Sequence, residues 1–100
     1  MNKTEMIINE VAAGVRTEME NSIASGCHGM HYEHIVGNAY VDVDVFEEHC
    51  GGYYTVVESV MVSHFDTRHR SPMLEERIKC VLPDWEELKT FMMADGRLSA

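Results

Sequence analysis

The chain has 100 residues, of which 45% are hydrophobic and 25% are charged. This length suits one small domain, here residues 1–100, and the composition is that of a folded chain, which excludes an intrinsically disordered protein. The 17 acidic residues outnumber the 8 basic ones and give a formal net charge of −9, which opposes direct binding to nucleic acid or to an anionic membrane.

Two features of the sequence bear on the cellular compartment. No uninterrupted apolar run resembles a signal peptide or approaches the length of a membrane-spanning helix. The three cysteines, Cys27, Cys50 and Cys80, are odd in number and widely spaced, which suits reduced thiols better than a disulfide framework. We therefore expect a cytoplasmic protein without a membrane partner.

An amphipathic helix is predicted over residues 4–25. Asn2 or Thr4 can cap its amino end, Glu5 stands at the spacing of a capping box after Asn2, and Gly26 is a natural stop. Gly14 costs this helix about 1 kcal/mol relative to alanine, which suggests that another backbone passes close to it. The apolar stripe recurs at every fourth position: Ile7, Val11, Val15, Met19 and Ile23.

A loop followed by a β-hairpin is predicted next. Residues 26–37 contain three glycines and are predicted to be a loop. Valine and aspartate then alternate, which predicts a strand over residues 38–48 with one buried and one wet face. A Gly-Gly turn leads into a second strand over residues 53–65, rich in β-branched and aromatic residues. We expect the valines of the first strand to share a core with the helix: Val41, Val43 and Val45.

The second strand of this hairpin has apolar side chains on both faces. One face would carry Tyr54, Val56 and Val60, and the other would carry Tyr53, Val57 and Met61. This pattern is typical of a strand covered on both sides, or of a strand whose register is shifted by a bulge. In the first case a second copy of the chain or a partner protein is the expected cover, whereas the plainer interpretation is an ordinary sheet core.

Two more elements are predicted towards the carboxyl end. Residues 75–82 alternate well enough to predict a third strand, although residues 74–79 would also fit a helical turn. Asp84 is a candidate helix cap and precedes apolar residues at helical spacing, which predicts a helix over residues 85–94. The tail, residues 97–100, is expected to fray. In the predicted third strand, three side chains would point inwards: Ile78, Cys80 and Leu82.

The order of these elements predicts an α+β fold. Two amphipathic helices and a sheet with one apolar face are best buried when both helices lie on the same side of the sheet. The expected architecture is a two-layer sandwich, with two helices on one face of a three-stranded antiparallel sheet, in the order α-β-β-β-α.

The segment SGCHGMHYEHIVG, residues 25–37, contains four side chains that are possible zinc ligands: Cys27, His28, His31 and His34. Their spacing does not favour a metal site, because the segment has no CxxC pair and adjacent Cys27 and His28 rarely bind one ion. We favour solvated histidines or histidines bonded to the backbone, and we expect no cofactor.

A pair of aspartates is the other candidate. Asp42 and Asp44 project from the same side of one strand, about 7 Å apart, and two such carboxylates suit a Mg²⁺ site or a hydrolase. More often they form the wet face of a sheet, with no catalytic role. If Arg77 and Lys79 lie on the same face, they would pair with these carboxylates.

Three functions are therefore hypothesised. The leading one is a small acidic interaction or accessory module, without catalysis, which acts through protein contacts and associates with itself. The second is a small metal-dependent or thiol-dependent enzyme that uses residues 27–34. The third is an acidic mimic of nucleic acid that inhibits a DNA-binding or RNA-binding protein.

Overall fold

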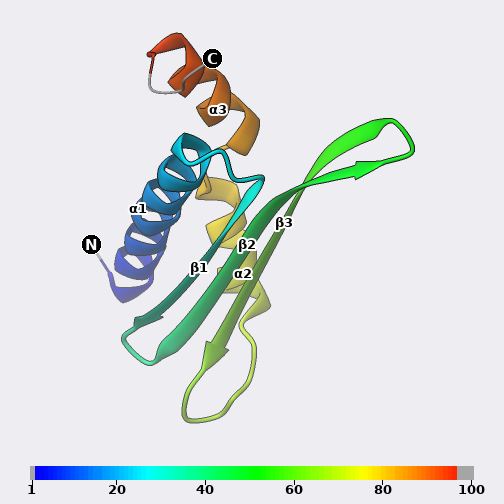
Figure 1. The fold of residues 1–100 in the computed structure, drawn as a ribbon. Helices are drawn as coiled ribbons and strands as arrows, with labels where there is room; N and C mark the ends of the chain where they lie inside the picture. Colours follow the sequence, from blue (N-terminus) through cyan, green and yellow to red (C-terminus); the bar gives the residue numbers. More distant parts are fainter. Residues whose placement is uncertain (1, 97–100) are drawn as a thin grey trace.

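A computed structural model describes residues 2–96, which form three helices and one antiparallel sheet (Figure 1). The sheet has the strand order β1-β2-β3, so that β2 is central and the other two strands are its edges. The elements, in chain order, are α1 Lys3–Ala24, β1 Gly29–Val36, β2 Ala39–Cys50, β3 Tyr53–His64, α2 Pro72–Val81 and α3 Trp85–Ala94.

The predicted first helix is confirmed as α1. The side chain of Asn2 accepts a hydrogen bond from the backbone N–H of Glu5 at 2.8 Å, which fixes the start of the helix. Gly26 follows the end with a φ of 76°, a conformation that glycine adopts without strain. The close approach predicted at Gly14 is made by the ring of Tyr32 from β1 and not by a backbone, since an added Cβ would overlap that ring.

The strands β2 and β3 confirm the predicted hairpin. The residues at its turn, Gly51 and Gly52, both have positive φ angles, as two-residue hairpin turns require. Alternate residues of β2 point to opposite faces, and the predicted valines Val41, Val43 and Val45 are completely or almost completely buried. They pack in one core with the apolar stripe of α1 and with Ile78 and Trp85.

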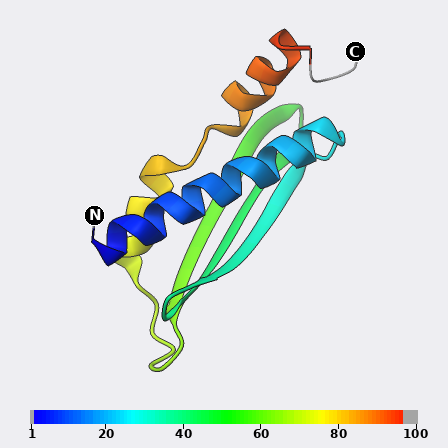
Figure 2. The ribbon, with the colours of Figure 1, turned by 90° about the vertical axis from the view of Figure 1, so that its left-hand side faces the viewer.

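The fold is α+β in the order α-β-β-β-α, as predicted, with α2 and α3 together forming one bent helical segment. The helices α1 and α2 lie over one face of the sheet, which we call the inner face, and α3 lies on the same side, beside α1 (Figure 2). The opposite face, which we call the outer face, has no helix over it. It carries the residues at odd positions of β1, at even positions of β2 and at odd positions of β3.

The predicted loop over residues 26–37 is wrong for most of its length, because residues 29–36 form β1. This strand pairs with β2 along its whole length, from Gly29 opposite Phe46 to Val36 opposite Ala39. The Gly37-Asn38 pair makes the two-residue turn between the strands, with a φ of 60° at Gly37. A Gly-Asn pair between two strand-like runs is a hairpin signal.

The predicted third strand over residues 75–82 is also wrong, because this segment belongs to α2. Pro72 occupies the first turn of the helix, where its missing N–H costs nothing. Leu74 and Ile78, four residues apart, are both buried, and that spacing is helical and not extended. Cys80, predicted to point inwards, is exposed, whereas Ile78 is buried and Leu82 is half-buried.

A buried glutamate explains why α2 docks on the sheet as a helix. Glu75 accepts a hydrogen bond from the backbone N–H of Val62, in β3, at 2.9 Å. It also accepts two from the guanidinium of Arg70, at 3.0 and 2.9 Å. The carboxylate is therefore fully partnered, which makes its burial tolerable.

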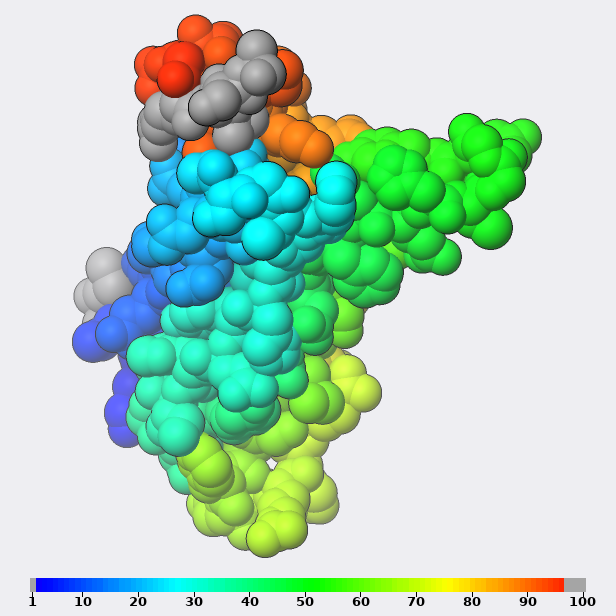
Figure 3. Space-filling view, in the orientation of Figure 1, coloured from blue at the N-terminus to red at the C-terminus, as the bar shows by residue number. Residues whose placement is uncertain are grey.

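The β2–β3 hairpin extends beyond the helices as an arm (Figures 1 and 3). We call residues 46–57 the hairpin arm. It carries exposed aromatic side chains, among them Tyr53, which is 82% exposed. Because an isolated two-stranded hairpin has little stability in water, this arm depends on contacts at its base.

The helices of residues 2–96 include none that is both long and apolar enough to cross a membrane. The predicted frayed tail, residues 97–100, lies outside the described part of the chain. The helix predicted over residues 85–94 is confirmed as α3, with Asp84 accepting a hydrogen bond from the N–H of Glu87 at 2.9 Å.

Candidate functional site

The four candidate ligands of residues 25–37 do not come together. Cys27 lies exposed just after α1, and His28 bonds to Glu47 on the inner face. His31 and His34 point to opposite faces of β1, because three positions separate them in a strand. His34 is half-buried, with its ring centroid 5.8 Å from that of Tyr32.

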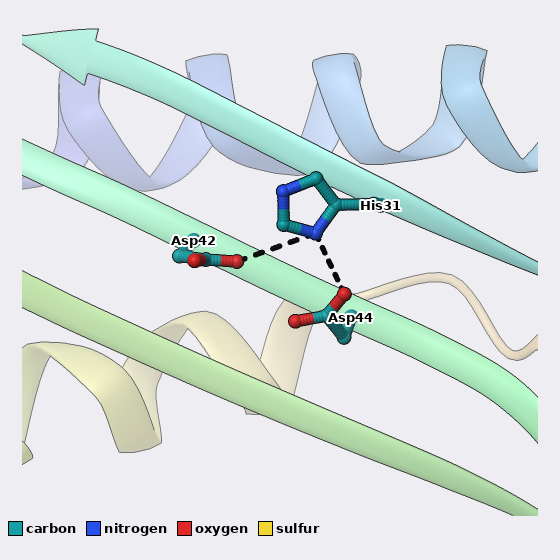
Figure 4. Close-up of side chains that lie close together, drawn as sticks. All are labelled: His31, Asp42 and Asp44. Atoms are coloured by element: carbon teal, nitrogen blue, oxygen red, sulfur yellow. Dashed lines mark hydrogen bonds and ion pairs between the residues drawn. The ribbon is translucent and has the colours of Figure 1, made fainter.

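His31 instead meets carboxylates on the outer face (Figure 4). The strand register places it opposite Asp44 and beside Asp42, and its Nδ1 lies 2.6 Å from an oxygen of Asp44 and 3.5 Å from one of Asp42. Its Nε2 lies 2.9 Å from an oxygen of Glu33. We call these four residues, His31, Glu33, Asp42 and Asp44, the His31 cluster.

The geometry of the His31 cluster requires a charged imidazole. Both ring nitrogens face a carboxylate oxygen, and both can donate only when the ring carries two protons. The hydrogen bonds to Glu33 and then to Asp44 raise the pKa of His31 to about 9, against a smaller opposing effect of burial. His31 is therefore a cation at neutral pH, and the cluster stabilises positive charge.

Asp42 is the least satisfied member of the cluster. Its Oδ1 is buried and has no hydrogen-bond partner within residues 2–96, since the N–H of His31 is directed at Asp44. Burial raises the pKa of Asp42, the charge of His31 opposes that effect, and the neighbouring Asp44 and Glu33 add to it. This oxygen is an acceptor that a second cationic group would satisfy.

The condition under which Arg77 and Lys79 would pair with these aspartates, a position on the same face, is not met. Both residues lie on α2, which covers the inner face, and Lys79 pairs with Glu76 at 3.6 Å. The positive charge on the outer face comes from His31. Sequence reasoning missed this role because it placed His31 in a loop; the Gly37-Asn38 turn signal would have revealed the pairing.

The cluster also has the chemistry of a divalent-cation site. One ligand atom from each of His31, Asp42 and Asp44 lies within 4.8 Å of the other two. Among residues 2–96, these three are the one group of three or more possible metal ligands that lie this close together. Glu33, bonded to the far ring nitrogen, would orient the imidazole as the second-shell carboxylates of metal sites do. A metal would have to displace the Nδ1 proton of His31, which therefore competes with it.

Apolar side chains border the cluster on both sides. Ile35 and Tyr40, whose hydroxyl also hydrogen-bonds to Glu33, form the adjacent pair towards the β1–β2 turn, and Phe46 and Val57 form the adjacent pair at the base of the hairpin arm. Ile35 is 60% exposed and Phe46 is 44% exposed. The outer face thus combines a charged centre with apolar flanks and has no covering element.

A second carboxylate centre lies on the inner face of β2, at the base of the hairpin arm. Oε2 of Glu47 accepts hydrogen bonds from the indole of Trp85 at 2.8 Å, from Lys89 at 2.9 Å and from the hydroxyl of Tyr54 at 3.0 Å. Its Oε1 lies 2.8 Å from Nδ1 of His28. We call these five residues the Glu47 network.

The Glu47 network joins the base of the hairpin arm to α3 and to the start of β1. Burial tends to raise the pKa of Glu47, but the hydrogen bonds from Trp85, Lys89, His28 and Tyr54 outweigh it and hold that pKa at about 2. Only 2% of the Glu47 side chain is exposed. The alternation of β2 places residue 47 on the inner face, so this buried acid was predictable, although its partners were not.

Comparison with known protein families, with curated proteins and with solved structures finds no match for this chain. Its function is therefore argued from its own residues.

Proposed function

We propose that this protein is a small interaction module whose outer face binds a basic, partly apolar segment of a partner protein. The observation that carries the proposal is the His31 cluster, an arrangement of three carboxylates that holds a histidine in its charged form beside an exposed apolar border. Such a surface favours arginine or lysine at its centre and aliphatic side chains around it.

The accessible carboxylates support a basic partner. The side chains of Glu33 and Asp44 are about half exposed, so an incoming guanidinium reaches them without any change in the sheet. The net charge of −9 attracts a basic segment at long range and speeds the encounter. A nucleic-acid mimic would use the same attraction, but the apolar flanks favour a protein-binding surface over an imitation of phosphates.

A second copy of the chain is the other occupant considered from the sequence. Face-to-face pairing would bring two His31 clusters together, each with three carboxylates and one imidazolium, and like charges in an interface are costly. We therefore favour a basic partner over self-association through this face. Three exposed, unbridged thiols support action in a reducing compartment, which we propose to be the cytoplasm.

One observation favours a second candidate function, the binding of a divalent cation such as Zn²⁺. It is the buried Oδ1 of Asp42, which lacks a hydrogen bond in residues 2–96 and lies beside the Nδ1 of His31 and the carboxylate of Asp44. Imidazole and carboxylate are ligands that zinc accepts.

The main experiment uses a synthetic amphipathic peptide with leucines and two central arginines, and a control peptide with glutamate in place of arginine. We expect only the arginine peptide to shift the amide resonances of the outer face in a ¹⁵N NMR titration. The double variant Asp42→Asn/Asp44→Asn should weaken this binding about tenfold.

The matched control is the double variant Glu76→Gln/Glu87→Gln, which removes the same charge from α2 and α3 and should weaken binding less than about twofold. Equal binding of the two peptides, or equal loss in the two double variants, would contradict the proposal. Light scattering that reveals a dimer joined through the outer face would assign that face to a second copy instead.

Zinc binding is tested separately by calorimetry in two buffers of different ionisation enthalpy. A true site takes up one Zn²⁺ and releases the proton of His31, and His31→Gln abolishes both signals while His49→Gln, on the hairpin arm, keeps them. Zinc uptake that survives His31→Gln would exclude this cluster as the site.

A further inference from the structure

A groove of about 660 Å³ lies on the helical side of the molecule, away from the outer face. It is lined by the first turns of α1, by the β1–β2 turn and by the start of α2, which lie beside one another in Figure 2. Its volume is within the range of about 300–1,000 Å³ that is usual for sites of small molecules. The groove is independent of the proposed partner surface.

The walls of this groove are mainly apolar. Met6 is 53% exposed and Met73 is 78% exposed, so a bound apolar group would bury side chains that now contact water. Methionine adapts its shape to irregular apolar ligands. The apolar lining consists of Met6, Ile7, Val36, Ala39, Met73 and Leu74.

Two basic side chains, Lys3 and Arg77, also line the groove. Lys3 and Arg77 have no carboxylate partner within residues 2–96, although the chain is strongly acidic. Of the five other basic residues among residues 2–96, Arg68 also has no carboxylate pair, whereas four do: Arg16, Arg70, Lys79 and Lys89. Two free cations at one apolar groove are complementary to a ligand with an anionic head and an apolar chain.

Other polar features of the groove act in both directions. The amino ends of α1 and α2 both lie at the groove and their dipoles favour an anion, although their first turns already carry Glu5 and Glu75. Ser71, the cap residue of α2, makes no side-chain capping bond that would occupy this end. Glu10, which also lines the groove, opposes an anion.

We propose that this groove binds a small free amphiphile, with a carboxylate or phosphate head between Lys3 and Arg77 and an apolar chain along the methionine-lined walls. The concave shape and the confined volume favour a single dissolved molecule over a membrane surface. Binding neutralises the two cations and covers Met6 and Met73.

The test is a titration of the full chain with sodium decanoate below its micelle concentration, followed by ¹⁵N NMR and calorimetry. We expect shifts at the start of α1, at Gly37 and at the start of α2. Decanol, which has the same chain without the charge, should bind at least about tenfold more weakly.

Charge variants locate the head group. Arg77→Gln should weaken decanoate binding about tenfold, whereas Lys79→Gln, which removes the same charge from the same helix but outside the groove, should change it less than about twofold. Glu10→Gln should strengthen binding, because it removes a like charge. Lys3→Gln, which removes the other exposed cation of the groove, should also weaken decanoate binding.

Three results would overturn the proposal. The first is equal affinity for decanoate and decanol, and the second is an equal effect of Arg77→Gln and Lys79→Gln. The third is binding to vesicles of anionic phospholipid without any binding of decanoate, because the ligand would then be a membrane and not a dissolved amphiphile.

Discussion

The two faces of β2 carry carboxylates in opposite circumstances. On the inner face, Glu47 is almost completely buried and receives hydrogen bonds from α3 and from β3. On the outer face, Asp42 and Asp44 share one imidazolium, and a buried oxygen of Asp42 has no hydrogen-bond partner in the described residues. The same strand therefore holds one buried acid with a full set of hydrogen-bonding partners and, on the other face, an aspartate with an unsatisfied buried oxygen beside a half-exposed one.

The carboxylate of the inner face therefore serves the stability of the fold, whereas the carboxylates of the outer face are suited to binding. A carboxylate with a full set of donors stabilises the fold and gains nothing from a further ligand. A cluster with an unmatched acceptor and exposed oxygens contributes less to folding and has more to gain from an incoming cation. Substitutions at Glu47 should therefore reduce stability, whereas substitutions at Asp42 should mainly change binding.

The largest effect is expected from Glu47→Gln. The amide keeps the shape of the side chain but loses the charge that holds four hydrogen-bonding partners, and it adds an N–H₂ group among donors. We expect the free energy of unfolding to fall by about 3 kcal/mol in urea denaturation. The control Glu48→Gln, on the exposed neighbour, should stay within about 0.5 kcal/mol of the wild type; similar losses in both variants would remove the distinction between the faces.

The difference in stability between the wild type and Glu47→Gln should depend on pH, because of the pKa of Glu47. Because the folded protein holds that pKa at about 2, below the ordinary 4.5, the charged carboxylate stabilises the fold above pH 4.5. This contribution is lost as the pH falls from about 5 towards 2. The gap in stability between the wild type and Glu47→Gln should therefore close over this window in acid denaturation, and a gap that stays constant would show that the charge is not its source.

The charge of His31 should contribute less to stability than that of Glu47, and its contribution should be lost as the pH rises and not as it falls. Its pKa is raised from 6.5 to about 9, so its contribution to stability is complete below pH 6.5 and is lost as the pH rises through 9. The wild type should lose stability relative to His31→Gln between pH 7 and 10, and the ring resonances of His31 should titrate near pH 9. Titration near pH 6.5 would contradict the three-carboxylate arrangement.

The smallest effect on stability is expected from Asp42→Asn. Removing a charge that burial disfavours should change the free energy of unfolding by less than about 0.5 kcal/mol. It should nevertheless lower the pKa of His31, because one of the charges near the ring disappears. NMR titration of the ring checks this result. A large loss of stability would show instead that the carboxylates of the outer face stabilise the fold as much as Glu47 does.

Much of this fold was predictable because regular periodicity survives in most of its elements. The fourfold spacing in α1 and the alternation in β2 are uninterrupted, and both led to correct elements. The strand β1 was missed because its inner face carries Tyr32 and His34, half-polar residues that obscure the alternation. The helix α2 was missed because its apolar residues fit two periods, and the contacts that decide between them, from Glu75 to Val62 and Arg70, are distant in the sequence or lie outside the helix.

The candidate site was only half predictable, for the same reason. Asp42 and Asp44 belong together in any strand, so their sequence spacing is sufficient. The part played by His31 depends on the register between β1 and β2, which local spacing does not contain. Similarly, the odd position of Glu47 in β2 indicates a buried acid, but its partners Trp85 and Lys89 lie about 40 residues further along the chain.

The position of Glu47 at the root of the hairpin arm has a mechanical consequence. One oxygen of this side chain binds both Tyr54, on the arm, and Lys89, on α3, so the arm cannot tilt without pulling on the last helix. A ligand that binds the exposed tip would therefore transmit force to α3 through a single carboxylate, at Trp85 and Lys89 in the first half of that helix.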